Sequence, residues 1–432
     1  FLETMTKWMP GLRYSFTVGG RSAAKDLHKC LDEIPKLPWT SATGAPLLKL
    51  NSVNITPPIL SLLIQVLNQP LPKSSDATEA KWSCIFIEEC KFARPQIVGS
   101  AADQDEDRSL LDSIRSFAAA LARRASSLYL RESPDIIECL FRTPRLEMND
   151  LTIDQMRWSA LQCERLGSLV QRSVQLKSLC FEGPSNLEEF EILVECLINS
   201  RHLKGLSINT GRERPATYQQ RGPALLDLVV TQIGDVIVAP LLQNPLSQLQ
   251  SLDIGGMHLG DNQFMVIVEA LPTSKIEQLF VRDNDIQCEG ILAFANKLPD
   301  IKCLKCVELG DNPWERTDEG FELCWSALLE GLLRNYTIED IGTEFQDNHP
   351  LVTLVTFYCH LNRVGRRLLA TSSDVPLGLW PLILERARMD DDKTCESPSA
   401  IYFFLQRSPV LSCARPFFSQ QKSPIKKRKY LV

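Results

Sequence analysis

The sequence lacks the features that mark a membrane protein or a metal-dependent enzyme. It has no run of about 18 apolar residues, the length typical of a membrane-spanning helix. Histidine is scarce, and its spacing matches neither a metal site nor a nucleophile–histidine pair. The five histidines are His28, His202, His258, His349 and His360. No GKS or GKT follows the glycine pair at Gly255, so this turn is not a phosphate loop. We therefore expect no catalytic residue, no metal and no cofactor, and a protein that is not an enzyme.

A strong excess of charge of either sign is also absent. The formal net charge is −6 over 432 residues at pH 7. A chain this close to neutral gives no electrostatic reason to expect nucleic acid or an anionic membrane as a partner. We therefore expect neither of them.

The sequence also lacks the pattern of a secreted disulfide scaffold, although it contains 14 cysteines. Several of them, such as Cys180, Cys196 and Cys324, lie inside apolar patterns, where a free cysteine behaves as a small hydrophobic residue. Free thiols favour a reducing compartment, so we expect an intracellular protein, in the nucleus or the cytoplasm. Cys303 and Cys306 form a C-x-x-C pair within an expected repeat strand. With no second pair nearby, we interpret them as structural residues rather than zinc ligands.

A pattern that returns about every 27 residues is present between Leu176 and Ile341. The stretches are LKSLCFEGPS from Leu176, LKGLSINTG from Leu203, LLDLVVTQIGD from Leu225, LQSLDIGGMHLGD from Leu249, IEQLFVRDNDIQCEG from Ile276 and LKCVELGDNPW from Leu304. Each approximates L-x-x-L-x-L-x-x-N/C-x-L, a short strand followed by a turn, which is the consensus of leucine-rich repeats. The pivotal apolar residues are Leu179, Leu206, Leu226, Leu252, Leu279, Val307 and Ile341, separated by 27, 20, 26, 27, 28 and 34 residues.

Amphipathic helices are expected between these strands. Phe264, Ile267 and Val268 follow Asp261 with the spacing of one helix face, and similar stripes recur after the other strands. Pro240 should kink its helix or confine it to a first turn. Strand, turn and helix in repetition predict an α/β solenoid.

The N-terminal third carries fainter copies of the same template. LLKLNSVNIT places Leu48, Leu50, Val53 and Ile55 on it, and CIFIEECKF places Ile85, Ile87, Cys90 and Phe92 on it. Their spacing is irregular, and the polar stretch from Gly99 reads as a loop insertion. We favour degenerate repeats, with a separate helical domain as the alternative.

Two repeats are specific enough to suggest a family. LDIGGMHLGDNQFMVIVEALP from Leu252 and LFVRDNDIQCEGILAFANKLP from Leu279 resemble leucine-rich-repeat proteins of the ribonuclease-inhibitor-like class. LNRVGRRLLA from Leu361, VPLGLWPLILERA from Val375 and IYFFLQRSPVL from Ile401 are similar to the C-terminal region of uncharacterised algal leucine-rich-repeat proteins. The resemblance implies an α/β leucine-rich-repeat solenoid, a horseshoe with an inner parallel sheet, outer helices and a helical C-terminal cap. It also implies a protein that binds other proteins.

Five segments are expected along the chain. Residues 1–40 form an N-terminal irregular or capping segment, and 41–170 form degenerate repeats with loop insertions. Residues 171–345 form the regular repeats, 346–410 the helical C-terminal cap and 411–432 a flexible basic tail.

In such a horseshoe the leucines point into the core, and the positions between them form the concave face. The candidate binding residues on that face are Lys177, Cys180, Glu182, Ser207, Asn209, Asp227, Asp253, Phe280, Arg282 and Glu308. Phe280 and Arg282 are two residues apart on a strand and so share a face. Aromatic residues and arginine are enriched among interface hot spots. The alternative is an ordinary solvated face on which a neighbour partly covers Phe280.

The tail carries four consecutive cations, Lys426, Lys427, Arg428 and Lys429, shortly after Ser423 and Pro424. A short basic cluster near a chain end is typical of a signal that a nuclear import receptor reads. The alternative is a chain end that only aids solubility.

These observations favour a non-catalytic protein-interaction scaffold or receptor that binds a protein partner on its concave face. One alternative is a regulator of a small Ran-like GTPase, because Ran GTPase-activating proteins share this repeat class. Those proteins end in a long acidic tail, whereas this chain ends in a basic one, which argues against that alternative. A further alternative is the sensor fragment of a larger receptor, because the sequence begins with Phe1 rather than Met.

Overall fold

One parallel sheet, with 11 strands among the residues that the structure describes, forms the centre of the fold. The computed structural model describes residues 15–19, 22–34, 47–69, 81–92, 103–154, 158–182, 187–209, 238–316, 318–342, 349–367, 380–389 and 401–403. The strand order is β1-β2-β4-β6-β7-β8-β9-β10-β11-β12-β13, so each strand pairs with the next along the chain apart from β3 and β5, which form a small sheet of their own. Consecutive order and parallel pairing are the topology of a repeat solenoid.

The strands are short, and each strand of the large sheet opens one repeat, whereas β3 and β5 lie later in the repeats of β2 and β4. They are β1 (Ser15–Gly19), β2 (Leu47–Asn51), β3 (Asn54–Ile55), β4 (Trp82–Glu88), β5 (Lys91–Phe92), β6 (Ala125–Arg131), β7 (Asp150–Asp154), β8 (Ser178–Glu182), β9 (Gly205–Asn209), β10 (Ser251–Asp253), β11 (Gln278–Phe280), β12 (Cys306–Glu308) and β13 (Asp340–Gly342).

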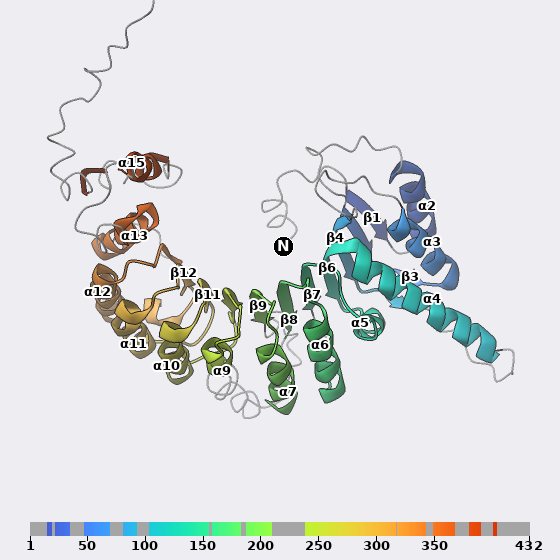
Figure 1. Ribbon diagram of the computed structural model, residues 1–432, viewed down its shortest axis with the longest axis horizontal. Helices are drawn as coiled ribbons and strands as arrows, with labels where there is room; N and C mark the ends of the chain where they lie inside the picture. The colour runs from blue at the N-terminus through green and yellow to red at the C-terminus, as the bar shows by residue number, and fades with distance from the viewer. Residues whose placement is uncertain are drawn as a thin grey trace, which may run out of the picture.

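Helices follow the strands and pack side by side on one face of the sheet. They are α2 (Ala23–Glu33), α3 (Pro57–Asn68), α4 (Asp103–Arg124), α5 (Pro134–Phe141), α6 (Ala160–Arg172), α7 (Leu187–Ile198), α9 (Ala239–Gln243), α10 (Asp261–Ala270), α11 (Cys288–Lys297), α12 (Asp318–Arg334), α13 (Pro350–Val364) and α15 (Trp380–Met389), with 3₁₀ turns η4 (Leu271–Thr273), η5 (Leu298–Asp300) and η6 (Pro313–Arg316). Figure 1 shows the repeats following an arc, with the strands on its inside and the helices on its outside.

The register of the sheet confirms the repeat pattern of the regular region. Leu206 pairs with Leu179 on one side and with Leu252 on the other. Leu279 pairs with Leu252 and with Val307, which in turn pairs with Ile341. These residues therefore form a single row of apolar side chains across the sheet, and the row is buried at every described strand from β8 to β12.

The repeat that we expected around Leu226 does not place a strand between β9 and β10. Because Leu206 on β9 pairs directly with Leu252 on β10, no further strand lies between them. The separations of 20 and 26 residues are therefore one repeat of 46 residues. The stretch from Leu225, with its candidate residue Asp227, lies outside the residues that the structure describes.

The N-terminal third belongs to the same sheet. Leu48 pairs with Ile85, Ile85 with Leu128, and Leu128 with Leu151, which continues the apolar row into β8. The described strands of this third therefore continue the sheet of the regular repeats.

The first described repeat lies within the segment that we expected to be irregular or capping. β1 pairs with β2 along its whole length, and α2 packs on β1 and on α3. The described part of residues 1–40 is therefore a regular strand–helix unit. It stands at the end of the sheet, which is the position that a cap occupies.

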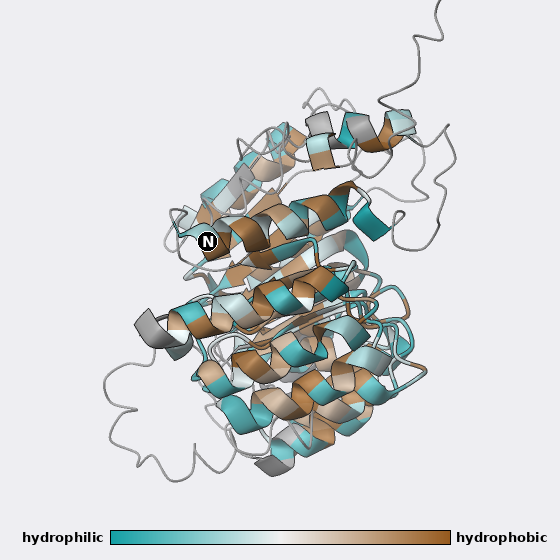
Figure 2. Ribbon diagram, turned by 90° about the vertical axis from the view of Figure 1, so that its left-hand side faces the viewer, coloured by the Kyte–Doolittle hydropathy of each residue, from teal (hydrophilic) through white to brown (hydrophobic). Residues whose placement is uncertain are grey.

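Each helix buries one stripe of side chains against the sheet. On α10, Phe264, Ile267 and Val268 are buried, as their spacing predicts. Figure 2 shows hydrophobic and hydrophilic residues alternating around the helices, the pattern of helices with one covered face. α9 has only five residues and carries Pro240 in its first turn, where the missing N–H has no intrahelical partner to lose.

At the C-terminal end α13 packs on α12 and on β13. The Asn362 side chain donates to the carbonyl oxygens of Asn335 (3.3 Å) and Ile338 (2.8 Å). The buried Arg366 guanidinium donates to the carbonyl oxygens of Leu332 (2.6 Å) and Asn335 (2.9 Å), at the end of α12. These contacts satisfy carbonyl groups that would otherwise have no intrahelical partner.

A small second core follows α13. Leu361 and Val364 from α13 pack with Trp380 and Ile383 from α15, and Phe403 packs against this cluster. α15 and residues 401–403 are therefore held at the end of the sheet through α13.

Candidate functional site

The inner face of the sheet consists of the strand residues that alternate with the core residues and point away from the helices. On β8, Leu179 and Phe181 are buried in the core, whereas Ser178, Cys180 and Glu182 are half-buried. The same alternation continues on β10 and β12. The inner face is thus the side of the sheet that lies inside the arc in Figure 1.

Most of the residues that the sequence indicated for the concave face lie on or beside these strands. Cys180, Glu182, Ser207, Asp253, Phe280 and Glu308 are strand residues of the inner face, Asn209 ends β9, Lys177 precedes β8 and Arg282 follows β11 by two residues. Asp227 lies outside the described residues. Their role in binding stays a prediction.

Phe280 occupies the middle of the C-terminal half of this face. It pairs with Asp253 on one side and with Glu308 on the other. Phe280 is half-buried and Arg282 is exposed. The Arg282 side chain lies against Gly255 of the preceding repeat, where an added Cβ would come within 3.2 Å of the Arg282 Cγ. An aromatic ring and a guanidinium are therefore presented together, with carboxylates at the neighbouring strand positions.

Asp253 is less exposed than a free strand position would be. It is half-buried, and its carboxylate accepts hydrogen bonds from the Ser207 hydroxyl (3.0 Å) and from the Gly255 amide (3.0 Å). Sequence reasoning missed this role because the two donors come from a neighbouring strand and from the turn after β10. Asp253 therefore holds the Ser207 side chain and the turn at Gly255 in place, and it also gives this part of the inner face a negative charge.

Glu308, Asp311 and Asp340 form an acidic patch around β12 and β13. Burial raises the pKa of Glu308. Arg282 opposes this shift, while the charges of Asp340 and Asp311 add to it. A side chain at Gly342 would collide with the Glu308 carboxylate, so that carboxylate lies over β13. Within the part of the chain that the structure describes, no cation lies within ion-pair distance of these three carboxylates.

The N-terminal half of the inner face is charged too, but its charges are compensated. Glu88 pairs with Lys49 (3.4 Å) and with Arg131 (3.3 Å), and Arg131 also lies 3.8 Å from Asp154. The Tyr129 hydroxyl donates to Asp154 at 2.8 Å, and burial together with this hydrogen bond raises the pKa of Tyr129. The sequence did not identify this network, although Tyr129 and Arg131 alternate with leucines in the weak repeat LYLRES.

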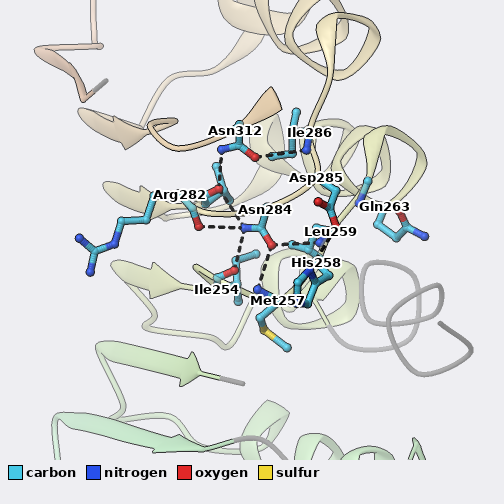
Figure 3. Close-up of polar contacts among 12 residues, drawn as sticks. Ile254, Met257, His258, Leu259, Gln263, Arg282, Asn284, Asp285, Ile286 and Asn312 are labelled. Atoms are coloured by element: carbon cyan, nitrogen blue, oxygen red, sulfur yellow. Dashed lines mark hydrogen bonds and ion pairs between the residues drawn. The ribbon is translucent and has the colours of Figure 1, made fainter. Parts of the chain in front are cut away.

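Two buried asparagines, Asn284 and Asn312, hold the turns that follow the strands of neighbouring repeats. Figure 3 shows Asn284 between two repeats: its Oδ1 accepts from the amides of Met257 (2.9 Å) and Leu259 (3.0 Å), and its Nδ2 donates to the Ile254 carbonyl (3.1 Å). Asn312 occupies the equivalent position in the next repeat, where its Oδ1 accepts from the Ile286 amide (3.2 Å). These buried amides are structural, and they hold Arg282 and Asp311 at fixed places beside the strands.

The cysteines of this region carry the chemistry of buried thiols. Burial raises the pKa of Cys180 and of Cys306 to about 11, so both are protonated at neutral pH and poor nucleophiles. Cys306 lies on β12, but Cys303 is exposed and precedes the strand, which corrects our placement of both within it. Over the described ranges, no three side chains of His, Cys, Asp or Glu come together as a metal site would need. No helix in these ranges has the length and apolar character required to cross a membrane.

No protein-family model matches the sequence, and no curated protein matches it. Solved structures do match. The match to actin-binding site 2 of leiomodin-1 covers 31% of this chain and 75% of the leiomodin-1 chain, at 20% identity and a TM-score of 0.26. The match to the C-terminal domain of Caenorhabditis elegans tropomodulin covers 50% of this chain and 100% of the tropomodulin chain, at 13% identity and a TM-score of 0.29. The match to a chain of the yeast Rad7 and Elc1 complex covers 74% of this chain and 76% of that one, at 13% identity and a TM-score of 0.35. These likenesses are too distant to carry a functional inference.

Proposed function

We propose that the protein is a non-catalytic interaction scaffold that binds a protein partner on the inner face of its sheet. In this proposal the repeats form a horseshoe of the ribonuclease-inhibitor-like class, the inner face is its concave surface, and α13 with α15 is its helical cap. The observation that carries the proposal is the face itself. From β8 to β13 it presents half-buried and exposed side chains in register, on the side of the sheet opposite the helices.

Phe280 and Arg282 are the residues that we expect to contribute most. Binding energy concentrates in a few aromatic and arginine side chains near the centre of an interface. Phe280 lies between Asp253 and Glu308 in the register, with room for a partner to complete its burial. Asp253 and Glu308 would then select a partner with complementary charge.

The first prediction compares this face with the helix side. The full chain, immobilised by a tag, is expected to retain a defined protein that the double variant Phe280→Ala/Arg282→Glu retains at least about tenfold less, a difference of about 1.4 kcal/mol. The measurement is quantitative mass spectrometry of the captured proteins. The matched control is Leu333→Ala/Arg334→Glu, which removes an apolar side chain and reverses an arginine charge at exposed positions on α12. If every captured protein is retained equally by both variants, the inner face is not the binding surface.

The second prediction concerns the basic cluster at residues 426–429, which lies outside the described residues. If an import receptor reads residues 422–430, a fluorescent fusion of the chain should concentrate in the nucleus, and Lys427→Ala/Arg428→Ala should disperse it. A phosphate on Ser423 would add about −1.5 to −2 charges beside the cluster, so Ser423→Asp should shift the fusion partly to the cytoplasm. The nuclear-to-cytoplasmic fluorescence ratio measures both effects. Equal ratios for the chain and its double variant would leave the cluster as a solubilising chain end.

A further inference from the structure

We propose that the basic C-terminal segment of this chain, residues 422–432, docks on the inner face of β10–β13. The inference concerns the same face as the proposed function and rests on it in one respect, since a docked segment would exclude a protein partner from that face. The segment would thus act as an internal competitor.

The first argument is the distribution of charge. Residues 404–432 contain seven lysines and arginines and no aspartate or glutamate, which leaves a net charge of −13 on residues 1–403. The two halves of the inner face differ in how their carboxylates are neutralised. Glu88 and Asp154 already have Lys49 and Arg131 as partners. The acidic patch of Glu308, Asp311 and Asp340 has no cation within ion-pair distance among the described residues, so this half complements a basic segment.

The second argument is the setting of the patch. Glu308 is half-buried, and burial raises its pKa. The charge of Arg282 opposes this shift and those of Asp340 and Asp311 add to it, so Arg282 offsets only part of the cost of the charged form. A cation placed beside it would relieve this repulsion in a medium less polar than water, where charges interact more strongly. Phe280, in register with Glu308, offers an apolar surface next to the patch. The segment has a matching apolar end in Tyr430, Leu431 and Val432.

The third argument is reach. Phe403 packs against the α13–α15 cluster, with its ring 6.3 Å from that of Phe357, and α13 packs on β13. Figure 1 shows α13 and α15 at the same end of the arc as β12. Lys426 follows Phe403 by 23 residues. A chain of that length spans up to about 75 Å when extended and roughly 25–30 Å as a coil, so it reaches the face easily. A tether of this kind gives an effective concentration on the order of 1 mM.

The test is a competition in the full chain. The probe is a fluorescein-labelled peptide of residues 420–432, and the measurement is its fluorescence anisotropy on titration with protein. In one protein, Lys426, Lys427, Arg428 and Lys429 are replaced by Gln. This variant should bind the peptide at least about tenfold more tightly than the unmodified chain, because its own segment no longer competes. Binding should weaken as salt is raised from about 50 to 500 mM.

Substitutions on the face locate the contact. In the tail-neutralised chain, Glu308→Gln/Asp340→Asn should weaken peptide binding at least about tenfold. The matched control, Glu191→Gln/Glu195→Gln, makes the same change of net charge at exposed positions of α7 and should have less than a twofold effect. Equal binding by the unmodified and tail-neutralised chains would overturn the proposal, as would equal effects of the two pairs of substitutions.

A second copy of the chain is the rival source of the segment. Light scattering distinguishes it, since a docked segment within one chain leaves the protein monomeric, and a dimer that disappears on tail neutralisation would overturn the proposal. No partner protein is present in either experiment. Failure of the competition therefore leaves the scaffold function standing, and failure of partner capture leaves the docking standing.

Discussion

Replacing Leu252 by Ala is expected to lower the free energy of unfolding by about 2–5 kcal/mol. Leu252 is fully buried, and its side chain lies in the apolar row between Leu206 and Leu279. Truncation leaves a cavity that the flanking repeats cannot close without moving the sheet. The measurement is urea unfolding followed by circular dichroism, which reports the loss of both strands and helices.

The matched control is Gln278→Ala, an exposed position on the inner face of β11, for which we expect a change below about 0.5 kcal/mol. Asp253→Ala should fall between the two, at about 1 kcal/mol, because it removes an acceptor for the Ser207 hydroxyl and the Gly255 amide. Equal losses from Leu252→Ala and Gln278→Ala would contradict the register of the sheet.

Ending the chain after Glu344 is expected to convert a soluble protein into an aggregating one. An open solenoid exposes the apolar edge of its last repeat unless something covers it. Val352, Val355 and Cys359 of α13 belong to the main core, and removing them would expose the apolar surface of α12. The truncation also removes Asn362 and Arg366, the donors to the carbonyl groups at the end of α12.

Size-exclusion chromatography with light scattering measures this outcome. A chain ending after residue 410 is the control, because it keeps α13, α15 and residues 401–403, and it should remain soluble. A soluble monomer that ends at Glu344 would show that α13 and α15 form an independent module rather than a cap.

The regular part of the fold could be predicted because its repeats obey a spacing rule. Leu206, Leu279 and Val307 each follow the leucine with which they pair by 27 or 28 residues, and the sheet pairs them in that register. Leu226 satisfied the same local pattern, but β9 and β10 pair directly with no strand between them, because a local apolar pattern says nothing about which strands pair.

The N-terminal repeats were harder to identify for a physical reason. The position that Asn284 and Asn312 occupy, with an amide that bonds two repeats at once, holds Val53, Cys90 and Ser133 instead. Ser133 replaces the amide with a hydroxyl that accepts from the Cys90 amide at 3.1 Å, a contact with no sequence signature of its own.

The sequence predicted which residues lie on the candidate face, but it did not predict the ion pairs and hydrogen bonds that they make. Alternation along a strand places Asp253, Phe280 and Glu308 on one side, and the structure has them there. Alternation cannot say that Glu88 and Asp154 have ion-pair partners while Asp340 has none among the described residues, because that depends on side chains from neighbouring strands. Asp340 follows a repeat whose spacing of 34 residues departs from the rule, and it was not identified from the sequence.

The direct pairing of β9 with β10 has a consequence for how such a chain can evolve. The two paired leucines are 46 residues apart, whereas those on the next two pairs of strands are 27 and 28 apart. The entropy of closing a connection rises only with the logarithm of its length, and doubling the length costs about 0.6 kcal/mol. Selection can therefore lengthen a connection between repeats almost without penalty while the sheet keeps its register. New sequence, and with it new specificity, can be acquired there by insertion rather than by rebuilding the core.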